Sequence, residues 1–104
     1  MANQALIPRD DTVTVGASSV ELSPETGAKE RQALVITNTS SAGQIISLAW
    51  GKDAVVGKGV VLLSGEHHVE AVDVAFKPLN SRICAISDAV GGTVAIHERL
   101  LQVF

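Results

Sequence analysis

The sequence predicts an all-β fold, because three of its features are typical of a β-sandwich. Apolar runs of about 4–8 residues recur between turn-forming residues, a length that suits strands and is short for helices. The apolar residues are mainly Val, Ile, Leu and Ala, and aromatic residues make up only 3%, so the core is expected to contain small branched side chains that suit a pleated sheet. At 104 residues, the chain has the length of one domain.

The clearest strand pattern lies between residues 31 and 65. Turn-forming residues separate three apolar runs there, Gln32–Ile36, Gln44–Trp50 and Gly59–Leu63. In the first run both faces of the expected strand are apolar, which is typical of a strand that is buried on both sides. We therefore expect this strand to lie under a loop of its own chain or against another subunit.

Further runs complete a set of about eight short strands. Polar and apolar residues alternate in several of them, as in strands with one buried face. Before the last run, Gly91-Gly92 is expected to supply the positive φ of a hairpin turn. The further runs are Asp11–Val15, Ser19–Leu22, His67–Val72, Ser81–Ser87 and Thr93–Glu98.

The spacing of these runs predicts an eight-stranded antiparallel β-sandwich, since short strands at regular intervals are typical of sandwiches and barrels. A single jelly roll is favoured because that fold uses eight strands. The connectivity of the strands does not follow from the sequence. An immunoglobulin-like sandwich therefore stays open as the alternative.

We predict an extended N-terminal arm at residues 1–10 and a single β-sandwich domain at residues 11–104. Pro8 restricts Ile7 to extended conformations, and Ala5-Leu6-Ile7 forms a short apolar patch in an otherwise polar arm. The arm is expected either to cover the core of its own domain or to contact a neighbouring subunit, since terminal segments are ordered only where they are tied down.

The segment Arg99–Phe104 contains four apolar side chains. Exposed apolar patches of this kind mark interaction sites, so this segment is expected to dock either on its own domain or on a partner. A partner is favoured because a sandwich of this size has limited surface left to cover. The residues expected to contact that partner, from both terminal segments, are Leu6, Ile7, Leu100, Leu101, Val103 and Phe104.

The charge pattern argues against nucleic acid as a partner. The net charge is −3 with a pI of about 5.5, and Lys and Arg are scattered rather than clustered. The first residues lack the basic start and apolar stretch of a secretory signal, and no apolar run approaches the roughly 20 residues of a membrane helix. The single cysteine, Cys84, cannot form a disulfide within the chain and is expected to be a small buried hydrophobe.

Histidine and glutamate residues offer only an incomplete metal-site pattern. Adjacent residues of a strand point to opposite faces, so His67 and His68 cannot share an ion. Glu66, His68 and Glu70 would share one face. His97 is the one further histidine, whereas zinc sites usually need three or four convergent ligands. We therefore predict no metal site and no cofactor.

No catalytic constellation is evident. Ser64, His67 and Asp73 are a formal nucleophile, base and acid set, but the sequence around Ser64 lacks the Gly-x-Ser-x-Gly of a nucleophile elbow. The glycine-rich stretch Gly57-Lys58-Gly59 lacks the spacing and the Ser or Thr of a phosphate-binding loop. The chain is therefore predicted not to be an enzyme.

A pattern of turn glycines and core aliphatic residues spans residues 31–98. It opens with an arginine, an apolar run and Asn-x-Ser, continues with a glycine-bounded hairpin, and closes with Gly-Gly-x-Val-x-x-x-Glu. Its elements are Arg31–Ser40, Ile46–Gly51, Gly57–Glu66, Ile83–Ser87 and Gly92–Glu98. This pattern resembles small β-sandwich structural proteins of bacteriophages and related icosahedral viruses.

The resemblance implies a non-enzymatic virion structural protein that is located in the capsid. The implied role is a penton or vertex subunit that assembles with itself, as a pentamer or else a trimer, and with a major capsid protein. Capsid decoration, spike and fibre-base roles are alternatives. A carbohydrate- or ligand-binding sandwich is an alternative of another class, although one Trp and no Tyr offer little surface for stacking on sugars. A cupin-type metal enzyme would need the convergent ligand set described above.

Overall fold

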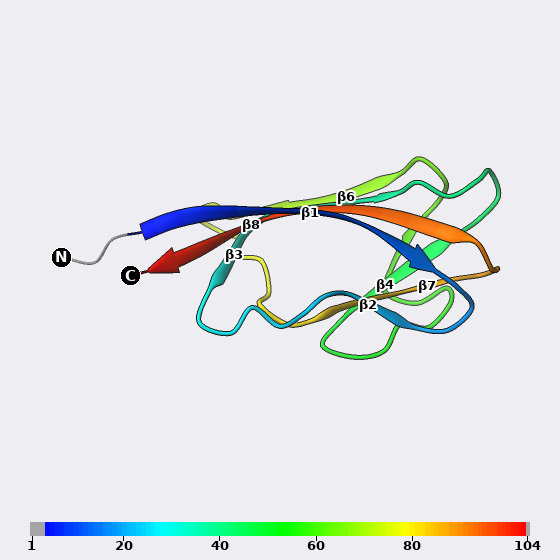
Figure 1. Ribbon diagram of the computed structural model, residues 1–104, viewed down its shortest axis with the longest axis horizontal. Coiled ribbons are helices and arrows are strands. Elements are labelled where there is room, and N and C mark those ends of the chain that lie inside the picture. The colour runs from blue at the N-terminus through cyan, green and yellow to red at the C-terminus, as the bar shows by residue number, and fades with distance from the viewer. Residues whose placement is uncertain (1–3, 104) are drawn as a thin grey trace.

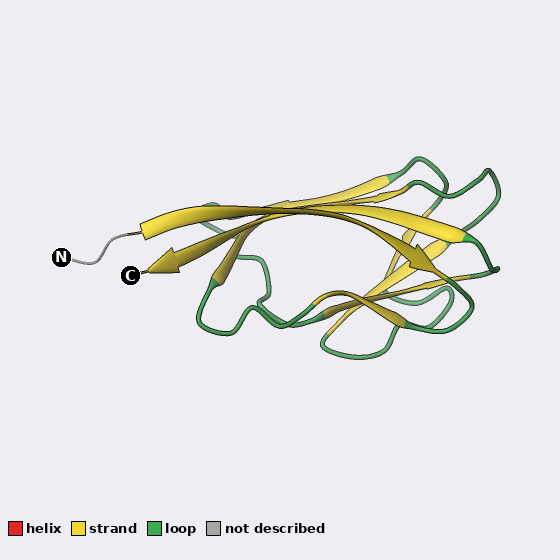
Figure 2. Cartoon of the chain, viewed as in Figure 1, coloured by secondary structure: helices red, strands yellow, loops and turns green. Residues whose placement is uncertain are grey.

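Residues 4–103, which are the part of the chain that this computed structural model describes, form eight β-strands and contain no helix (Figures 1 and 2). These residues therefore include no helix that could cross a membrane. The all-β prediction is confirmed, and each predicted run corresponds to a strand. The strands are β1 (Gln4–Val15), β2 (Val20–Ser23), β3 (Glu30–Asn38), β4 (Ile46–Trp50), β5 (Val60–Leu62), β6 (His67–Ala71), β7 (Ile83–Ser87) and β8 (Gly92–Val103).

The strands form two four-stranded antiparallel sheets, in the orders β1-β8-β3-β6 and β2-β7-β4-β5. Within them β1 pairs with β8, β2 with β7, β3 with β6 and β4 with β5. The chain is thus one folded antiparallel ribbon wound into two sheets, which is a jelly roll. In an immunoglobulin-like sandwich the first two strands share a sheet, whereas β1 and β2 lie in different sheets. The predicted jelly roll is confirmed.

The first strand is longer than predicted. β1 begins at Gln4, and each residue from Gln4 to Val15 has a partner in β8, so the expected boundary after Asp10 lies inside one continuous strand. Pro8 is compatible with this strand because β1 is at the edge of its sheet, where proline is tolerated. The role of residues 4–10 as an arm towards a neighbouring subunit stays a prediction.

The last strand also extends beyond its predicted end at Glu98, as far as Val103. We call residues Gln4–Pro8 and Arg99–Val103 the overhang, because these paired ends of β1 and β8 project beyond the strands of the second sheet (Figure 1). Gln4 and Val103, the first and last described residues, lie at this end of the molecule, which measures 50 × 25 × 22 Å along its principal axes.

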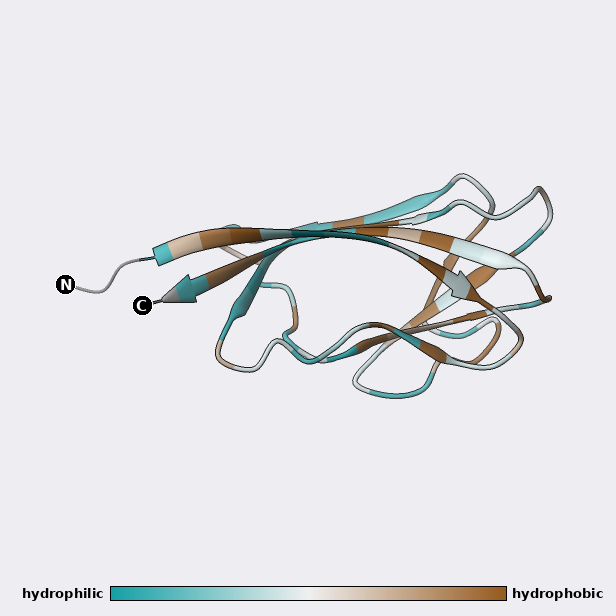
Figure 3. Cartoon of the chain, viewed as in Figure 1, coloured by the Kyte–Doolittle hydropathy of each residue, from teal (hydrophilic) through white to brown (hydrophobic). Residues whose placement is uncertain are grey.

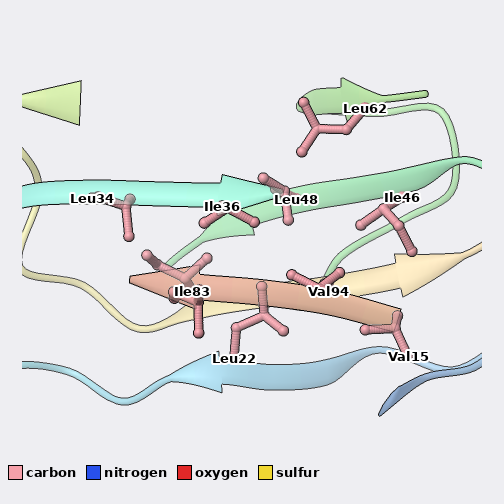
Figure 4. Packing of buried hydrophobic residues seen from close by; sticks show 11 residues of the cluster. Val15, Leu22, Leu34, Ile36, Ile46, Leu48, Leu62, Ile83 and Val94 are labelled. Carbon is pink, nitrogen blue, oxygen red and sulfur yellow. The ribbon is translucent and has the colours of Figure 1, made fainter. Parts of the chain in front are cut away.

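The hydrophobic core lies between the two sheets, where alternate residues of each strand point inward (Figure 4). Leu34 and Ile36 of β3 are fully buried there, in one cluster with Ile46 and Leu48 of β4 from the opposite sheet. Alternation predicted the buried face where it is clear, as at Val94 and Ile96 of β8, but not in β3, where both faces are apolar.

The outer face of β3 is apolar but is not enclosed. Ala33 and Val35 are only half-buried, so no loop of the described residues covers this face in the way that one of the two expectations required. Contact with another subunit stays a prediction.

Cys84 is buried, with 1% of its surface exposed, in a small second cluster with Ala49 and Ala54. Its expected role as a small buried hydrophobe is confirmed.

Two turns require glycine for different reasons. Gly91 has a φ of +81°, as predicted, whereas Gly92 has no positive φ and is needed because a Cβ there would lie 2.7 Å from the carbonyl oxygen of Val15. Gly59 combines both constraints, since its φ is +80° and a Cβ would lie 2.2 Å from the carbonyl oxygen of Leu48.

We expect Gly59→Ala to lower the free energy of unfolding far more than the matched change Gly57→Ala. The φ angles of these glycines are +80° and +81°, so both alanines would bear about 1 kcal/mol of left-handed strain. Only Gly59→Ala adds a steric clash, because a Cβ at Gly57 meets nothing within 4 Å; overpacking of this kind adds about 1–3 kcal/mol. Urea denaturation measures both losses, and equal losses would contradict the close approach to Leu48.

Candidate functional site: the overhang and its buried ion pair

A buried ion pair lies where the overhang leaves the sandwich. Arg31 Nε donates to Glu98 Oε2 at 2.8 Å, and the two side chains are 0% and 1% exposed. Glu98 follows the inward-facing Val94 and Ile96 along β8, so the alternation of the strand directs its carboxylate to the interior. Arg31 lies at the start of β3, beside a register shift between Arg31 and Ala33 in the pairing with β8.

The other carboxylate oxygen of Glu98 also has protein partners. Oε1 accepts hydrogen bonds from Ser23 Oγ at 2.7 Å and from Arg9 Nη1 at 2.9 Å. Arg9 in turn donates to the carbonyl oxygen of Leu22 at 3.1 Å. Glu98 thus links β8 to β1, β2 and β3.

The guanidinium of Arg31 extends the network to the loop before β7. Its Nη2 donates to Ser23 Oγ at 3.2 Å, and its Nη1 donates to the carbonyl oxygens of Leu79 and Ser81, the latter at 3.1 Å. The main-chain N–H of Arg31 donates to Asn80 Oδ1 at 2.9 Å. A buried charge is tolerated only where it is paired and hydrogen-bonded, and this network meets that condition for both charges.

The pKa of the Glu98 carboxyl lies below its ordinary value of 4.5. Burial raises this pKa, but the hydrogen bonds from Ser23 and Arg31 and the charges of Arg31 and Arg9 lower it by more. Glu98 therefore stays ionised near neutral pH, and the base of the overhang is held by opposite charges.

The sequence contains one clear signal for this pair. Alternate residues of β8 point inward, and Glu98 follows Val94 and Ile96 in this pattern. A buried carboxylate that needs a cationic partner could therefore have been predicted. Its partner could not, because the irregular pairing between Arg31 and Ala33 breaks the alternation along β3. Arg31 and Glu98 are, however, the two ends of the pattern that resembled viral proteins.

Four of the predicted interface residues form two cross-strand pairs in the overhang. Leu6 is opposite Leu101 on the outer face of the sheet, and Ile7 is opposite Leu100 on the inner face. Leu6 is 56% exposed, and the other three are half-buried. Figure 3 shows the hydrophobic colouring of this part of β1.

The remaining two predicted interface residues lie at the end of β8 or beyond it. Val103 is opposite Gln4 in the overhang. Phe104 lies outside the described residues.

A second group of exposed apolar side chains, which the sequence did not indicate, lies in the loop between β6 and β7. Val74 is fully exposed, and Val72, Phe76 and Leu79 are 42%, 45% and 59% exposed. This loop lies at the same end of the sandwich as the overhang (Figure 1). Apolar loop residues usually cover the core of their own domain. The sequence alone therefore did not indicate that these four side chains are exposed.

The candidate metal ligands do not converge. His68 Nε2 and Glu70 Oε2 are 2.9 Å apart and share the inward face of β6, but Glu66 instead binds the main chain of the preceding turn. His97 lies on the outer face of β8, with its Nδ1 2.6 Å from Asp10 Oδ1. Within residues 4–103, no group of three or more His, Cys, Asp or Glu side chains is placed to hold a metal ion.

The formal nucleophile, base and acid set is also dispersed. Ser64 precedes β6 and donates to the carbonyl oxygen of Ser40 at 2.7 Å. Asp73 follows β6 and accepts hydrogen bonds from the main-chain N–H groups of Ala75 and Phe76. Ser64 and Asp73 therefore stabilise turns at opposite ends of β6.

Trp50, at the end of β4, packs against the core cluster. Its ring meets that of His68 edge-on, with centroids 5.5 Å apart.

Comparison with known proteins shows similarity in fold. No protein-family model matches the sequence, and no curated protein matches it. A chain of a structure described as Bacillus endospore appendages that form a novel family of disulfide-linked pili aligns with a TM-score of 0.69 and 10% identity, over 97% of this chain and 88% of that chain.

Two viral proteins share the fold as well. A chain of the acidic stable capsid structure of Helicobacter pylori bacteriophage KHP30 aligns with a TM-score of 0.57 and 9% identity, over 100% of this chain and 97% of that chain. Tobacco streak virus coat protein aligns with a TM-score of 0.52 and 14% identity, over 96% of this chain and 86% of that chain. The chain is thus a jelly roll of the kind found in capsid and appendage proteins.

We expect Glu98→Gln to lower the free energy of unfolding by about 3 kcal/mol, because it leaves the charge of Arg31 buried without its counter-ion. The change Glu25→Gln has the same chemistry at an exposed position and should lie within about 0.5 kcal/mol of the wild type. Urea denaturation near neutral pH compares the two. Similar values for both variants would contradict a structural role for the pair.

The pH dependence of stability gives a second test of the pair. Since the pKa of Glu98 is lowered in the folded state, its contribution is complete above pH 4.5 and is lost as the pH falls through the folded-state pKa. The double variant Arg31→Met/Glu98→Leu removes both charges and should lose less stability than the wild type on acidification. Unfolding curves at a series of pH values measure this, and equal acid losses would contradict the assignment.

Proposed function

We propose that this protein is a non-enzymatic structural subunit of a virion. In this proposal it forms the penton at the five-fold vertex of a capsid, and copies associate with one another and with a major capsid protein through the overhang. The observation that carries the proposal is the overhang itself, whose apolar side chains include the exposed Leu6. The shared fold with the phage capsid chain and the plant virus coat protein supports it.

The physical basis of the proposal is the removal of apolar surface from water. At the end of the sandwich that carries the overhang, Leu6 and four apolar residues of the loop between β6 and β7 are at least 42% exposed. Their burial against neighbouring copies would stabilise an assembly by about 25 cal/mol per Å² of apolar surface. Pairing of open sheet edges within a closed ring would also remove sites for non-specific aggregation.

A second candidate function is that of a subunit in an extracellular filament. It is favoured by the higher structural similarity to the appendage protein, with a TM-score of 0.69. The same head-to-tail contact forms a ring if its rotation closes and a filament if it does not. The only cysteine, Cys84, is buried, so a filament of this chain would not be linked by disulfides in its folded form.

The native mass of the purified protein, alone and with the major capsid protein of its virus, tests the proposal. A pentamer supports the penton role, and a trimer supports the spike or decoration role. Long filaments in electron micrographs support the second candidate. A monomer that also fails to bind the capsid protein would contradict a role in assembly.

We expect Leu6→Asp to weaken association by about tenfold or more, which is the effect of losing one well-packed interface side chain. Val90→Asp is the matched control, because Val90 is 80% exposed and lies in the turn before β8 at the opposite end of the sandwich (Figure 1). Sedimentation velocity measures association, and thermal unfolding shows that both variants fold. Equal weakening by both substitutions would contradict an interface at the overhang.

A further inference from the structure

The first sheet has two open edges, β1 and β6. The unpaired main-chain groups of an edge strand are a template for another strand, and native proteins usually protect or pair them. In β1, the segment Pro8–Asp11 carries proline and charge, whereas Gln4–Ile7 carries no charge.

The register of the sheet places two polar residues of β1 opposite the positions of two polar residues of β6, with β8 and β3 between them. Arg9 is opposite Glu98, which is opposite Leu34, which is opposite Glu70. In the same way, Asp11 of β1 and His68 of β6 lie in one row across the sheet, through Ile96 and Ile36. A second copy placed sideways beside the first, without a shift along the strands, would therefore set Arg9 beside Glu70 and Asp11 beside His68.

These side chains have unused capacity for such contacts. Glu70 Oε1 is buried and has no hydrogen-bond partner among the described residues. Arg9 uses three donor hydrogens, toward Glu98, Asp11 and the carbonyl oxygen of Leu22, and a guanidinium has five. Both side chains lie on the inner face of the sheet, so they would meet on the same side of a continuous sheet.

The alternation of main-chain hydrogen bonds agrees with this register. The main-chain groups of Asn38 bind Gly65 and Glu66 beside β6, and pairs alternate along an antiparallel ladder. As a result, the main-chain N–H and C=O groups that point to the open edges belong to the odd-numbered residues of β6 and the even-numbered residues of β1. Val69 and Asp10, which share a level, would therefore form a hydrogen-bonded pair across the joint.

The exposed apolar groups lie on opposite edges at the same end of the sheet. Leu6 and Ile7 continue β1 beyond the level of β6, and Val72, Val74 and Phe76 follow β6 into its loop. In the same register, the overhang of one copy would lie beside this loop of the next copy. One placement thus brings together both the polar side chains and the apolar surfaces.

We propose that β1 of one copy adds antiparallel to β6 of the next copy, with Arg9 beside Glu70 and Asp11 beside His68, so that the first sheets of neighbouring copies form one continuous sheet. This proposal rests on the self-association proposed above and specifies its geometry. The joint is head-to-tail, so it uses both edges of every copy and can close into a ring. A two-fold pairing of β6 with β6 would leave β1, the longer edge of 12 residues, unpaired.

Disulfide trapping tests the joint directly. Asp11 and His68 would form a non-hydrogen-bonded pair, whose Cα atoms lie about 4.5 Å apart in antiparallel sheets, within the range that a disulfide spans. We expect an equal mixture of the Asp11→Cys and His68→Cys variants to form disulfide-linked dimers under oxidised glutathione. In a randomly mixed head-to-tail ring, about one joint in four has the two cysteines facing each other. The double variant should link whole rings.

Controls fix the register and the direction of the joint. Asp11→Cys mixed with Glu66→Cys, a position two residues out of register, should not form linked dimers. Val69→Cys alone should not either, and if it does, β6 pairs with β6 about a two-fold axis and the proposal is overturned. The native Cys84 is buried and serves as the unreactive background in all variants.

Native mass measured on the same variants separates the two levels of the proposal. An intact assembly without a link between Asp11→Cys and His68→Cys overturns the joint and leaves the proposed function standing. A chain that does not assemble, alone or with capsid protein, overturns both. A linked ring of the assembly's own size supports both.

Discussion

The buried pair of Arg31 and Glu98 determines how the two long strands leave the sandwich. Two charges placed away from water are unfavourable unless hydrogen bonds satisfy them, and here those bonds come from β1, β2 and the loop before β7. The pair therefore does more than join β3 to β8. It fixes every segment around the base of the overhang in one arrangement, so that apolar side chains are presented in a defined geometry beyond the core.

The other end of β3 has a second polar centre, at Asn38. Its fully buried side chain donates to the carbonyl oxygens of Gln44 and Leu62 and accepts a hydrogen bond from the main chain of Ser40. One strand thus places satisfied polar groups at both ends of the aliphatic core. Because unsatisfied groups in such positions are costly, the two centres specify one packing of the sheets, whereas the interchangeable Val, Leu and Ile side chains between them do not.

The strands and their buried faces could be predicted because both follow from local alternation, as in Val94 and Ile96. The pairing of β1 with β8 could not, since it joins residues at opposite ends of the sequence. Residues 1–10 were therefore predicted as an extended arm, separate from the strand that begins at Asp11, although Gln4–Val15 form one edge strand. The site was found only in part: Leu6 and Ile7 were indicated by their hydrophobicity, but Arg31 was hidden by its irregular pairing, and the exposure of Val74 depends on a loop conformation that no periodicity encodes.

The pairing of the first strand with the last has a consequence for biosynthesis. β1 leaves the ribosome before the other described strands, but its partner β8 follows all of them, so the first sheet cannot close until synthesis has passed Glu98. Contacts so distant in sequence also form slowly. The partner strand of β1 and the counter-ion of Arg31 are therefore both supplied by the same late strand, and a chain without β8 has neither the closed first sheet nor the overhang. In the proposed assembly, the surface that contacts a neighbour would therefore form only after β8 has been synthesised.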